Sequence, residues 1–363
     1  MKKPLFLIFC FLVASLSLYS QESTSVSFTE KFINVKDHNI HYLDFGGEGI
    51  PVILIPSGTW NAEVYRDFGP FLNDNNQVFA ITMPGYGKSE GDRYDVPSQG
   101  DYLIGFLDAL KLEKAVFIGN SSATAEITYL AENYPNRVAG VVYLSGLSTP
   151  WVWDIMNEKD PHQTNKMYTR YAYSEDPIDA LNEGGKQSNS RKNKAEEILA
   201  ARSTYRPKHF TEDIIINVPA LFFTNKDGRL GYEKDVAALL VAGSPLMDEV
   251  RQSFPPSPFR DDLDRRVTDP EYRAAQFDRM KDSSARAFFY KLAADTVMQR
   301  EVLDFQIETV YPALIAAQDR MKKAFGANAQ LVKLDTPIVV DYAYRDAPEL
   351  ILGDLIEFLK ELD

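Results

Sequence analysis

The sequence of 363 residues predicts an α/β protein built on a mostly parallel, doubly wound sheet. One observation is a series of continuous apolar runs, typical of strands buried on both faces: 51–55, 77–82, 115–118 and 138–144. The second is that amphipathic stretches with helical spacing separate these runs: 62–72, 99–110 and 123–134. Strands that alternate with helices favour a parallel sheet with helices on both faces. Functional residues of such sheets collect at the carboxyl ends of the strands, so each of these ends is a candidate site.

The composition narrows the range of partners. Hydrophobic residues make up 45% of the chain and charged residues 25%, which is an ordinary balance for a globular protein. The formal net charge of -13 argues against a nucleic-acid partner, which needs a basic surface, and against attraction to an anionic membrane. The single cysteine, Cys10, excludes disulfides within the chain and cysteine-based zinc sites. A small molecule is therefore the expected partner, and the sequence gives no indication of the oligomeric state.

The amino-terminal residues 1–20 are typical of a signal peptide. Lys2 and Lys3 precede an apolar run at 5–18 that is too short to span a bilayer, and Ser20 offers a small residue at the cleavage point. We therefore expect export to a bacterial periplasm or beyond, with no membrane span after the signal is removed. An uncleaved anchor is the alternative.

The apolar run at 115–118 leads through Gly119-Asn120-Ser121-Ser122-Ala123 straight into a helical stretch. A serine on such a tight strand-to-helix turn is held above the edge of the sheet. Its neighbours must be small because the backbone approaches itself there. The amino terminus of the helix that follows favours a developing oxyanion. Ser121 is thus the candidate nucleophile.

This turn resembles the nucleophile elbow Gly-x-Ser-x-Gly of the α/β-hydrolase family, with Ala123 in place of the last glycine. Three more segments resemble family motifs in the same order: the strand and oxyanion loop at 52–58, the Asp-x-Pro-Gly-x-Gly-x-Ser turn at 82–89 with Thr82 in the aspartate position, and the helix end at 131–138. The resemblance covers about residues 35–148. It implies an α/β-hydrolase fold and an oxyanion hole formed by the backbone N–H groups of Gly58 and Ser122.

The same resemblance divides the chain into a core that an enlarged helical cap interrupts. The predicted segments are the first part of the core at 21–148, a cap at 149–213, a core strand with an acid loop at 214–229, a helical insertion at 230–326, and the last strand and closing helix of the core at 327–363. Amphipathic stretches at 270–281 and 284–311 predict helices within the insertion. The returning strand at 214–223 ends just before Asp227, which would be the acid of the triad.

The sequence lacks a histidine where the family has its catalytic one. That residue should stand about seven residues before Pro348, where this chain has Asp341. In a second alignment 336–340 is the acid-bearing strand and Asp346 is the acid, which leaves the chain without a final strand and again supplies no histidine. A carboxylate acts as the base only if its pKa is raised, and repulsion and burial of the neighbouring carboxylates Asp341 and Asp227 would achieve this.

The four histidines of the chain offer few substitutes for the missing base. His38 and His41 lie in the first strand region, where polar side chains are expected to face solvent. His209 precedes the strand at 214–223 and is expected at the opposite edge of the sheet from Ser121. His162 leaves from the carboxyl edge and is the candidate for a substitute base.

Two classes of function remain. The first is an exported serine-type hydrolase of a small ester, lactone, amide or carbon–carbon substrate, with an atypical triad of Ser121, Asp227 and Asp341. The second is a non-catalytic relative that binds a ligand or partner through the enlarged cap. The small-residue elbow favours the enzyme, whereas the missing histidine favours the binding protein. No metal cluster or phosphate-binding glycine loop is visible in the sequence, so no metal and no cofactor are expected.

Overall fold

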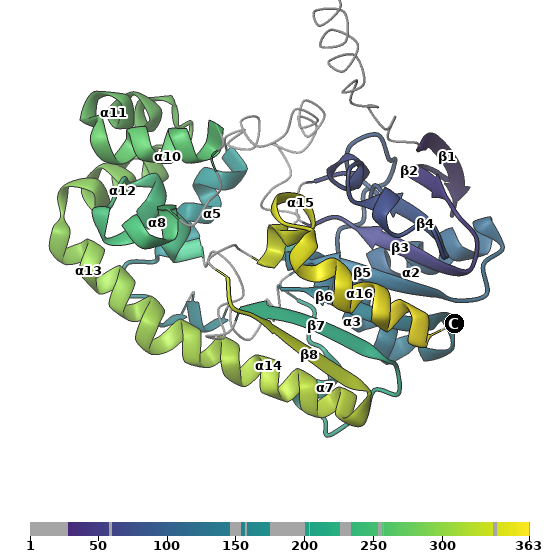
Figure 1. Ribbon diagram of the computed structural model, residues 1–363. Coiled ribbons are helices and arrows are strands. Elements are labelled where there is room, and N and C mark those ends of the chain that lie inside the picture. Colours follow the sequence, from purple (N-terminus) through teal and green to yellow (C-terminus); the bar gives the residue numbers. More distant parts are fainter. Residues whose placement is uncertain are drawn as a thin grey trace, which may run out of the picture.

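The computed structural model describes residues 28–57, 60–145, 154–156, 158–174, 200–202, 204–225, 234–252, 256, 258–336 and 340–362. Within these residues the centre is an eight-stranded sheet with the order β1-β2-β4-β3-β5-β6-β7-β8 (Figure 1). The strands are β1 (Thr29–Val35), β2 (His38–Gly46), β3 (Ile50–Ile55), β4 (Asn76–Ile81), β5 (Ala115–Asn120), β6 (Val138–Leu144), β7 (Ala220–Asn225) and β8 (Ala329–Leu334).

Of these strands only β2 runs opposite to the other seven, because it pairs antiparallel with both β1 and β4. The pairings from β4 through β3, β5, β6 and β7 to β8 are all parallel. The carboxyl ends of β3 to β8 therefore lie along one edge of the sheet. The predicted mostly parallel α/β sheet is confirmed.

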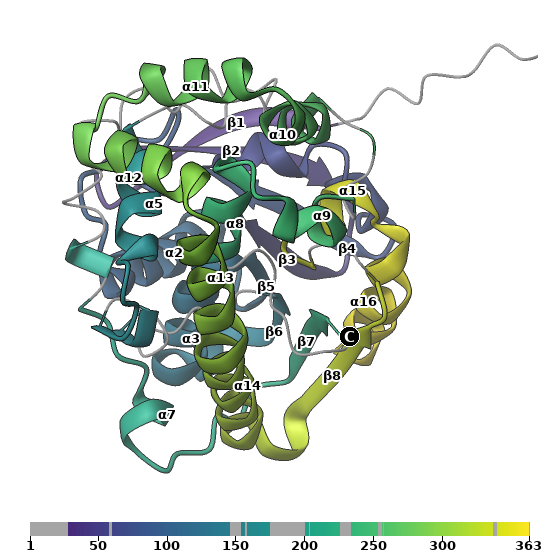
Figure 2. The ribbon, with the colours of Figure 1, turned by 90° about the vertical axis from the view of Figure 1, so that its left-hand side faces the viewer.

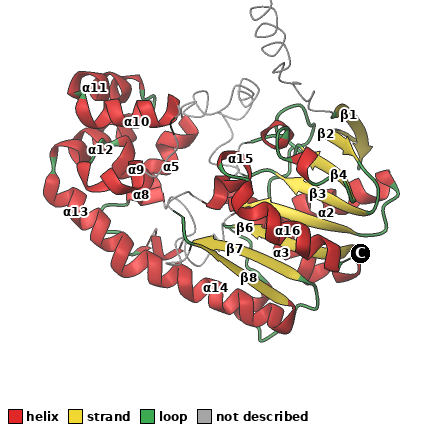
Figure 3. Ribbon diagram, in the orientation of Figure 1, coloured by secondary structure: helices red, strands yellow, loops and turns green. Residues whose placement is uncertain are grey.

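Helices cover both faces of the sheet (Figure 3). One face packs on α2 (Val96–Leu110), α3 (Thr124–Asn133) and α14 (Tyr311–Phe325), and the other on α16 (Glu349–Glu361). In β5, Phe117 joins the first core, while Val116 and Ile118 join the second. Side chains alternate between the faces of a strand, so a strand covered on both sides must be apolar throughout. This explains why the central strands appear in the sequence as continuous apolar runs.

A helical cap lies beside the sheet (Figure 1), its helices stand in front of the strands in the turned view (Figure 2), and it has a core of its own. It comprises α5 (Thr164–Ser174), α8 (Lys234–Val241), α9 (Asp248–Gln252), α10 (Pro258–Thr268), α11 (Pro270–Arg279), α12 (Ser283–Ala294) and α13 (Thr296–Phe305). Tyr171 of α5 contacts Phe289 of α12, with ring centroids 5.5 Å apart. The segments predicted as a cap and as an insertion therefore share one core. A π-helical turn, η7 (Gln306–Val310), joins α13 to α14 and so links the cap to the sheet.

The prediction of one helix at 62–72 is wrong. The structure has two short 3-10 helices there, η1 (Ala62–Tyr65) and η2 (Gly69–Phe71). Pro70 has no backbone N–H, and its ring disfavours the helical conformation at the preceding residue, so it divides the segment. The helix predicted at 284–311 is likewise divided, because the Asp295 side chain accepts hydrogen bonds from Val297 and Met298 and begins α13 as its N-cap.

The returning strand is shorter than predicted, since β7 begins only at Ala220. Pro219 just before it cannot donate to a strand ladder. The Ile216 N–H donates instead to the carbonyl of Ala324 at the end of α14, at 2.8 Å. The apolar residues at 214–219 thus pack as an irregular segment against a helix.

The predicted signal peptide at 1–20 lies outside the described residues. Within the residues that are described, no helix combines the length and hydropathy needed to cross a bilayer.

Candidate active site

Ser121 follows β5 directly and adopts a left-handed backbone conformation, with φ at +48°. This conformation is strained for a residue with a side chain and is found at tight functional turns. The turn also needs small residues. A Cβ atom added to Gly119 would lie 3.2 Å from the Cβ of Ala123, where the chain folds back to begin α3. Ser121 therefore has the geometry of a nucleophile elbow.

The residue before Ser121 is held by contacts from the segments below the turn. Asn120 is fully buried, and its Oδ1 accepts a hydrogen bond from the hydroxyl of Tyr65 at 3.1 Å. The same hydroxyl lies 2.9 Å from the carbonyl of Ile55 at the end of β3. Tyr65 in turn packs on Tyr344, with ring centroids 4.7 Å apart. Tyr344 belongs to α15 (Ala343–Asp346), so the segment that follows β8 is brought next to the elbow.

The residue after Ser121 is held by the segment at 200–202. Arg202 donates to the carbonyl of Ser122 at 2.9 Å and forms a two-pronged ion pair with Glu126, one contact of which is 2.9 Å. Glu126 lies on the first turn of α3 and is almost completely buried. A buried carboxylate needs a partner. Arg202 supplies it and at the same time connects the cap side of the chain to the elbow.

Thr82, in the family's aspartate position, organises the turn after β4. Its hydroxyl oxygen accepts from the Ala62 N–H at 3.0 Å and lies 2.7 Å from Nδ1 of His41. The hydroxyl of Ser89 donates to the carbonyl of Thr82 and accepts from the His41 N–H. The expectation that His41 faces solvent is wrong, because its side chain fills the space between this turn and β1 and is 1% exposed.

One group of described residues has the chemistry of a metal site. Ligand atoms of Glu30, His41 and Glu63 lie within 4.8 Å of one another. Lys88 already forms an ion pair with Glu30, and Arg66 pairs with Glu63. The two carboxylates therefore have cationic partners within the protein itself.

The predicted acid and base follow the last two strands of the sheet. Asp227 comes two residues after β7 and lies outside the described residues, as does the predicted oxyanion donor Gly58. Asp341 belongs to η9 (Val340–Tyr342), whose Tyr342 stacks on Trp60 at 5.4 Å, but its side chain lies outside the described part. The structure thus brings the segment of Asp341 to the loop that follows β3.

The second alignment does not match this topology. The described sheet ends with β8 after β7, and α16 follows as a closing helix. Asp346, the acid of that alignment, lies in α15, beyond the last strand. Its carboxylate pairs with Arg345 at 2.6 Å, and Arg345 lies over the Tyr342 and Trp60 rings.

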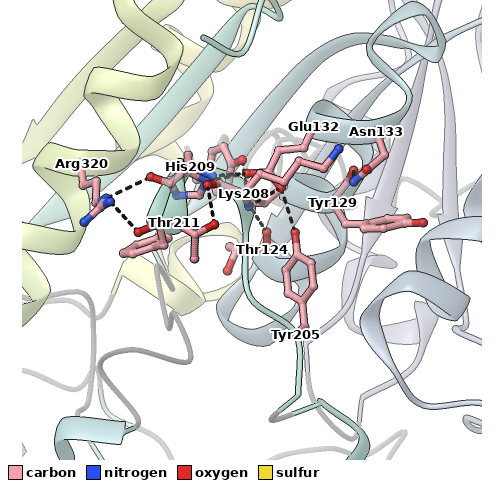
Figure 4. Close-up of polar contacts among 12 residues, drawn as sticks. Thr124, Tyr129, Glu132, Asn133, Tyr205, Lys208, His209, Thr211 and Arg320 are labelled. Atoms are coloured by element: carbon pink, nitrogen blue, oxygen red, sulfur yellow. Dashed lines mark hydrogen bonds and ion pairs between the residues drawn. The ribbon is translucent and has the colours of Figure 1, made fainter. Parts of the chain in front are cut away.

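The structure brings none of the four histidines to Ser121 by a hydrogen bond. His162 bonds through Nε2 to Glu301 of α13 at 2.8 Å, and Nδ1 of His38 lies 2.9 Å from the Tyr102 hydroxyl. His209 lies against Glu132, with its Nδ1 2.7 Å from the carboxylate (Figure 4). Glu132 lies eight residues after Thr124, the first residue of α3, which is about 12 Å of helix further from Ser121. His209 therefore lies towards the amino edge of the sheet, as its place in the chain predicted.

Sequence reasoning missed the supports of the elbow, namely Tyr65, Glu126 and Arg202. A local signal exists only for Glu126. It occupies a position of α3 that faces the protein interior, and a charge there requires a partner. The identity of that partner cannot be read from the sequence because 76 residues separate the two.

Comparison with known proteins also indicates an α/β-hydrolase fold. Residues 50–210 match the family model described as the alpha/beta hydrolase fold. A 2-hydroxy-6-oxononadienedioate/2-hydroxy-6-oxononatrienedioate hydrolase of Paraburkholderia phymatum is 31% identical over 131 residues, which is 32% of this chain and 45% of that protein. A 2-hydroxy-6-oxo-6-phenylhexa-2,4-dienoate hydrolase of Burkholderia cepacia is 29% identical over 132 residues, covering 33% of this chain and 46% of its own. The chain thus spans less than half the length of these curated relatives.

A solved structure resembles nearly the whole chain. It is a candidate lipase from Acinetobacter baumannii, with a TM-score of 0.53, 14% identity and 96% of each chain covered. At this identity the likeness concerns the fold alone. Together with the sheet order, the strained serine after β5 and the family-model match, these likenesses lead to one conclusion. The chain has the α/β-hydrolase fold, and its residues 50–210 match the family model of that fold.

Proposed function

We propose that this protein is an exported serine-type hydrolase that acts on a small ester, lactone, amide or carbon–carbon substrate through Ser121. The observation that carries the proposal is the left-handed conformation of Ser121 at the end of a central strand, in front of α3. Such a turn holds the hydroxyl above the sheet edge and directs the helix amino terminus towards the developing charge. The names of the relatives from Paraburkholderia and Burkholderia, which are hydrolases, support the same class.

The proposed triad is atypical. Asp227 would be the acid, and Asp341 would stand where the family has its histidine. An aspartate removes the serine proton only if its pKa is raised, and a second carboxylate close to it raises the pKa by repulsion. Turnover should then be slow, and its pH profile should follow a carboxylate, without a step near the ordinary imidazole pKa of about 6.5.

Labelling with a fluorophosphonate tests whether Ser121 is activated. The reagent phosphonylates an activated serine as the Ser121 oxygen attacks phosphorus and fluoride leaves. We expect one equivalent of label, mapped to Ser121 by peptide mass spectrometry and lost in Ser121→Ala. Protein unfolded in urea is the control and should remain unlabelled. Labelling of another serine, or equal labelling of the unfolded chain, would contradict the proposal.

Replacing Asp341 tests which group is the base. If only the base is missing from an otherwise complete site, Asp341→His should raise ester turnover by tenfold or more, because imidazole accepts a proton at neutral pH. Asp341→Asn should lower it. His162→Ala is the matched comparison, since that side chain is bonded to Glu301. Activity that survives Asp341→Asn but is abolished by His162→Ala would transfer the role of base to the cap.

A non-catalytic relative that binds a ligand or partner is the second candidate. The specific observation in its favour is that each of the four histidines is bonded to a side chain other than Ser121. A serine without a base near neutral pKa is a weak nucleophile. Complete resistance of folded protein to the fluorophosphonate, together with saturable binding of a small ester that is recovered unhydrolysed, would support this candidate over the enzyme.

A further inference from the structure

Three hydroxyl-bearing residues stand in a row at the carboxyl edge of the sheet. Asn120 of β5 pairs with Leu144 of β6, which pairs with Phe223 of β7. The residues that follow these three are Ser121, Ser145 and Thr224. Neighbouring strands lie about 4.8 Å apart, so Ser145 is about 5 Å and Thr224 about 10 Å from the strand of the nucleophile.

Ser145 combines two unfavourable features. Its backbone is left-handed, with φ at +59°, and its side chain is 1% exposed while the hydroxyl has no hydrogen-bond partner among the described residues. The backbone itself is firmly placed, because the Ser145 N–H donates to the carbonyl of Phe223 at 3.1 Å. Glycine would relieve the strain, and alanine would remove the unpartnered hydroxyl. Strained backbone conformations and buried polar groups without hydrogen bonds occur most often at functional sites.

Thr224 repeats the second feature on the next strand. It is 2% exposed, and its hydroxyl also has no hydrogen-bond partner within the described chain. Its backbone is part of the regular ladder with Lys333 of β8, so nothing in the strand requires a hydroxyl at this position. Valine has the same shape as threonine and would fill the site without leaving a buried polar group unmatched.

We propose that Ser145 and Thr224 form a polar subsite beside Ser121 for an uncharged, hydrogen-bonding oxygen of the substrate. The subsite rests on the proposed function, because it places the oxygen relative to the carbonyl that Ser121 attacks. Both residues are neutral hydroxyls, which donate to a keto or ester oxygen and offer no countercharge for a carboxylate. The spacing of the strands puts that oxygen about 5 to 10 Å from the reacting carbonyl. The substrate class is an acyl compound with a second, neutral oxygen group within that distance.

Matched esters test the substrate class. Wild-type protein should hydrolyse p-nitrophenyl 4-oxopentanoate with a kcat/KM at least tenfold above that for p-nitrophenyl pentanoate, which lacks only the keto oxygen. Ser145→Ala with Thr224→Val should reduce this ratio to near one. The ratio does not depend on the fraction of folded protein or on how well Ser121 is activated, because both affect the two esters equally. A preference unchanged in the double variant, or no preference in the wild type, would overturn the subsite.

Thermal unfolding provides a readout that does not need activity. Removing an unpartnered buried hydroxyl should raise Tm, by about 1–3 °C for each variant. The control is Thr128→Val on α3, whose equally buried hydroxyl bonds to the Thr124 carbonyl at 2.7 Å and to the Tyr143 hydroxyl at 3.0 Å. This variant should lower Tm and leave the ester ratio unchanged. If Ser145→Ala and Thr224→Val lower Tm as Thr128→Val does, the two hydroxyls are structural and the proposal fails.

Failure of the enzyme proposal gives a different pattern. If neither ester is hydrolysed, methyl 4-oxopentanoate should still raise the Tm of the wild type more than methyl pentanoate does, and the double variant should lose this difference. That result would retain the subsite and reject the hydrolase. Equal shifts with the two methyl esters would reject the subsite, whatever the fluorophosphonate result.

Discussion

His41 makes the fold sensitive to mild acid. Burial, and then the nearby positive charge of Lys88, lower the pKa of His41 below its ordinary value, although Glu30 acts in the opposite direction. The unfolded chain therefore takes up a proton at a pH where the folded protein does not. The contribution of His41 to the free energy of unfolding is fully present above about pH 6.5, the ordinary pKa of histidine. It is lost as the pH falls towards the folded pKa, and it amounts to about 1.4 kcal/mol for each pH unit by which the pKa is lowered.

Urea unfolding between pH 8 and pH 5 measures this effect. The variant His41→Asn keeps a polar group near the Thr82 hydroxyl but removes this titrating side chain, so its stability should fall less than that of the wild type through this range. The Lys88 hydrogen bond lowers the pKa of Glu30 below the ordinary carboxyl value, and its contribution is therefore lost only at more acidic pH. A wild type whose stability is flat between pH 8 and pH 5 would refute the prediction.

At the residue scale, the sequence predicted the turn at Ser121, because the residues that form it are adjacent in the chain. The residues Gly119 to Ala123 lie next to each other, and their small size is a property of the turn itself. The residues around the turn come from distant segments. Tyr65 reaches Asn120 across 55 positions, and Arg202 reaches Glu126 across 76. Such pairs are fixed by packing, and a single sequence carries no signal for them.

At the scale of elements, the ion pair between Arg202 and Glu126 joins the cap side of the chain to α3. The side chain of Arg202 is 14% exposed and that of Glu126 is 2% exposed, so solvent screens the pair little. Arg202→Met should leave a buried carboxylate without its partner and cost about 3 kcal/mol of unfolding free energy. Ester turnover should fall as well, because the Ser122 carbonyl loses its donor.

The double variant separates the charge from the packing. Arg202→Met with Glu126→Gln removes both charges and should recover at least half of the stability lost in Arg202→Met alone. The exposed pair of Lys323 with Asp213 is the matched control, and Lys323→Met should change stability by less than about 0.5 kcal/mol. If the double variant is no more stable than Arg202→Met, the contact acts through packing, and the buried-charge explanation is wrong.

The elements that the sequence predicted well are those buried on two faces. The runs that became β3 to β6 are apolar throughout because helices cover both sides of the sheet. Apolar residues at 214–219 gave the same signal, although they pack against α14 without forming a strand. A run of apolar residues thus indicates that a segment is buried, but not whether it forms a strand. At 62–72 and at 214–219 the prolines prevented the regular helix and strand that the apolar pattern predicted.

At the scale of the whole molecule, the protein has three cores. Two lie on the faces of the sheet, and the third lies within the cap, where α5, α8 and α10 to α13 meet. A cap with its own core can lose its packing while the sheet stays folded, because cooperative units of one chain open separately. The sequence predicted the two cap segments but not their common core, since α5 and α12 are separated by the whole of β7.

Phe289→Ala tests the independence of the cap. Phe289 is fully buried in the cap core against Tyr171 and Phe277, and its truncation should cost about 3–5 kcal/mol locally. Hydrogen exchange followed by mass spectrometry should show faster exchange in α8 and α10 to α12, with β3 to β6 unchanged. Phe106→Ala, an equally buried change on α2 under the sheet, is the matched control and should speed exchange in the strands first. The same loss of protection in cap and sheet for both variants would mean that the molecule unfolds as one unit, and that motion of the cap is not available to admit a substrate.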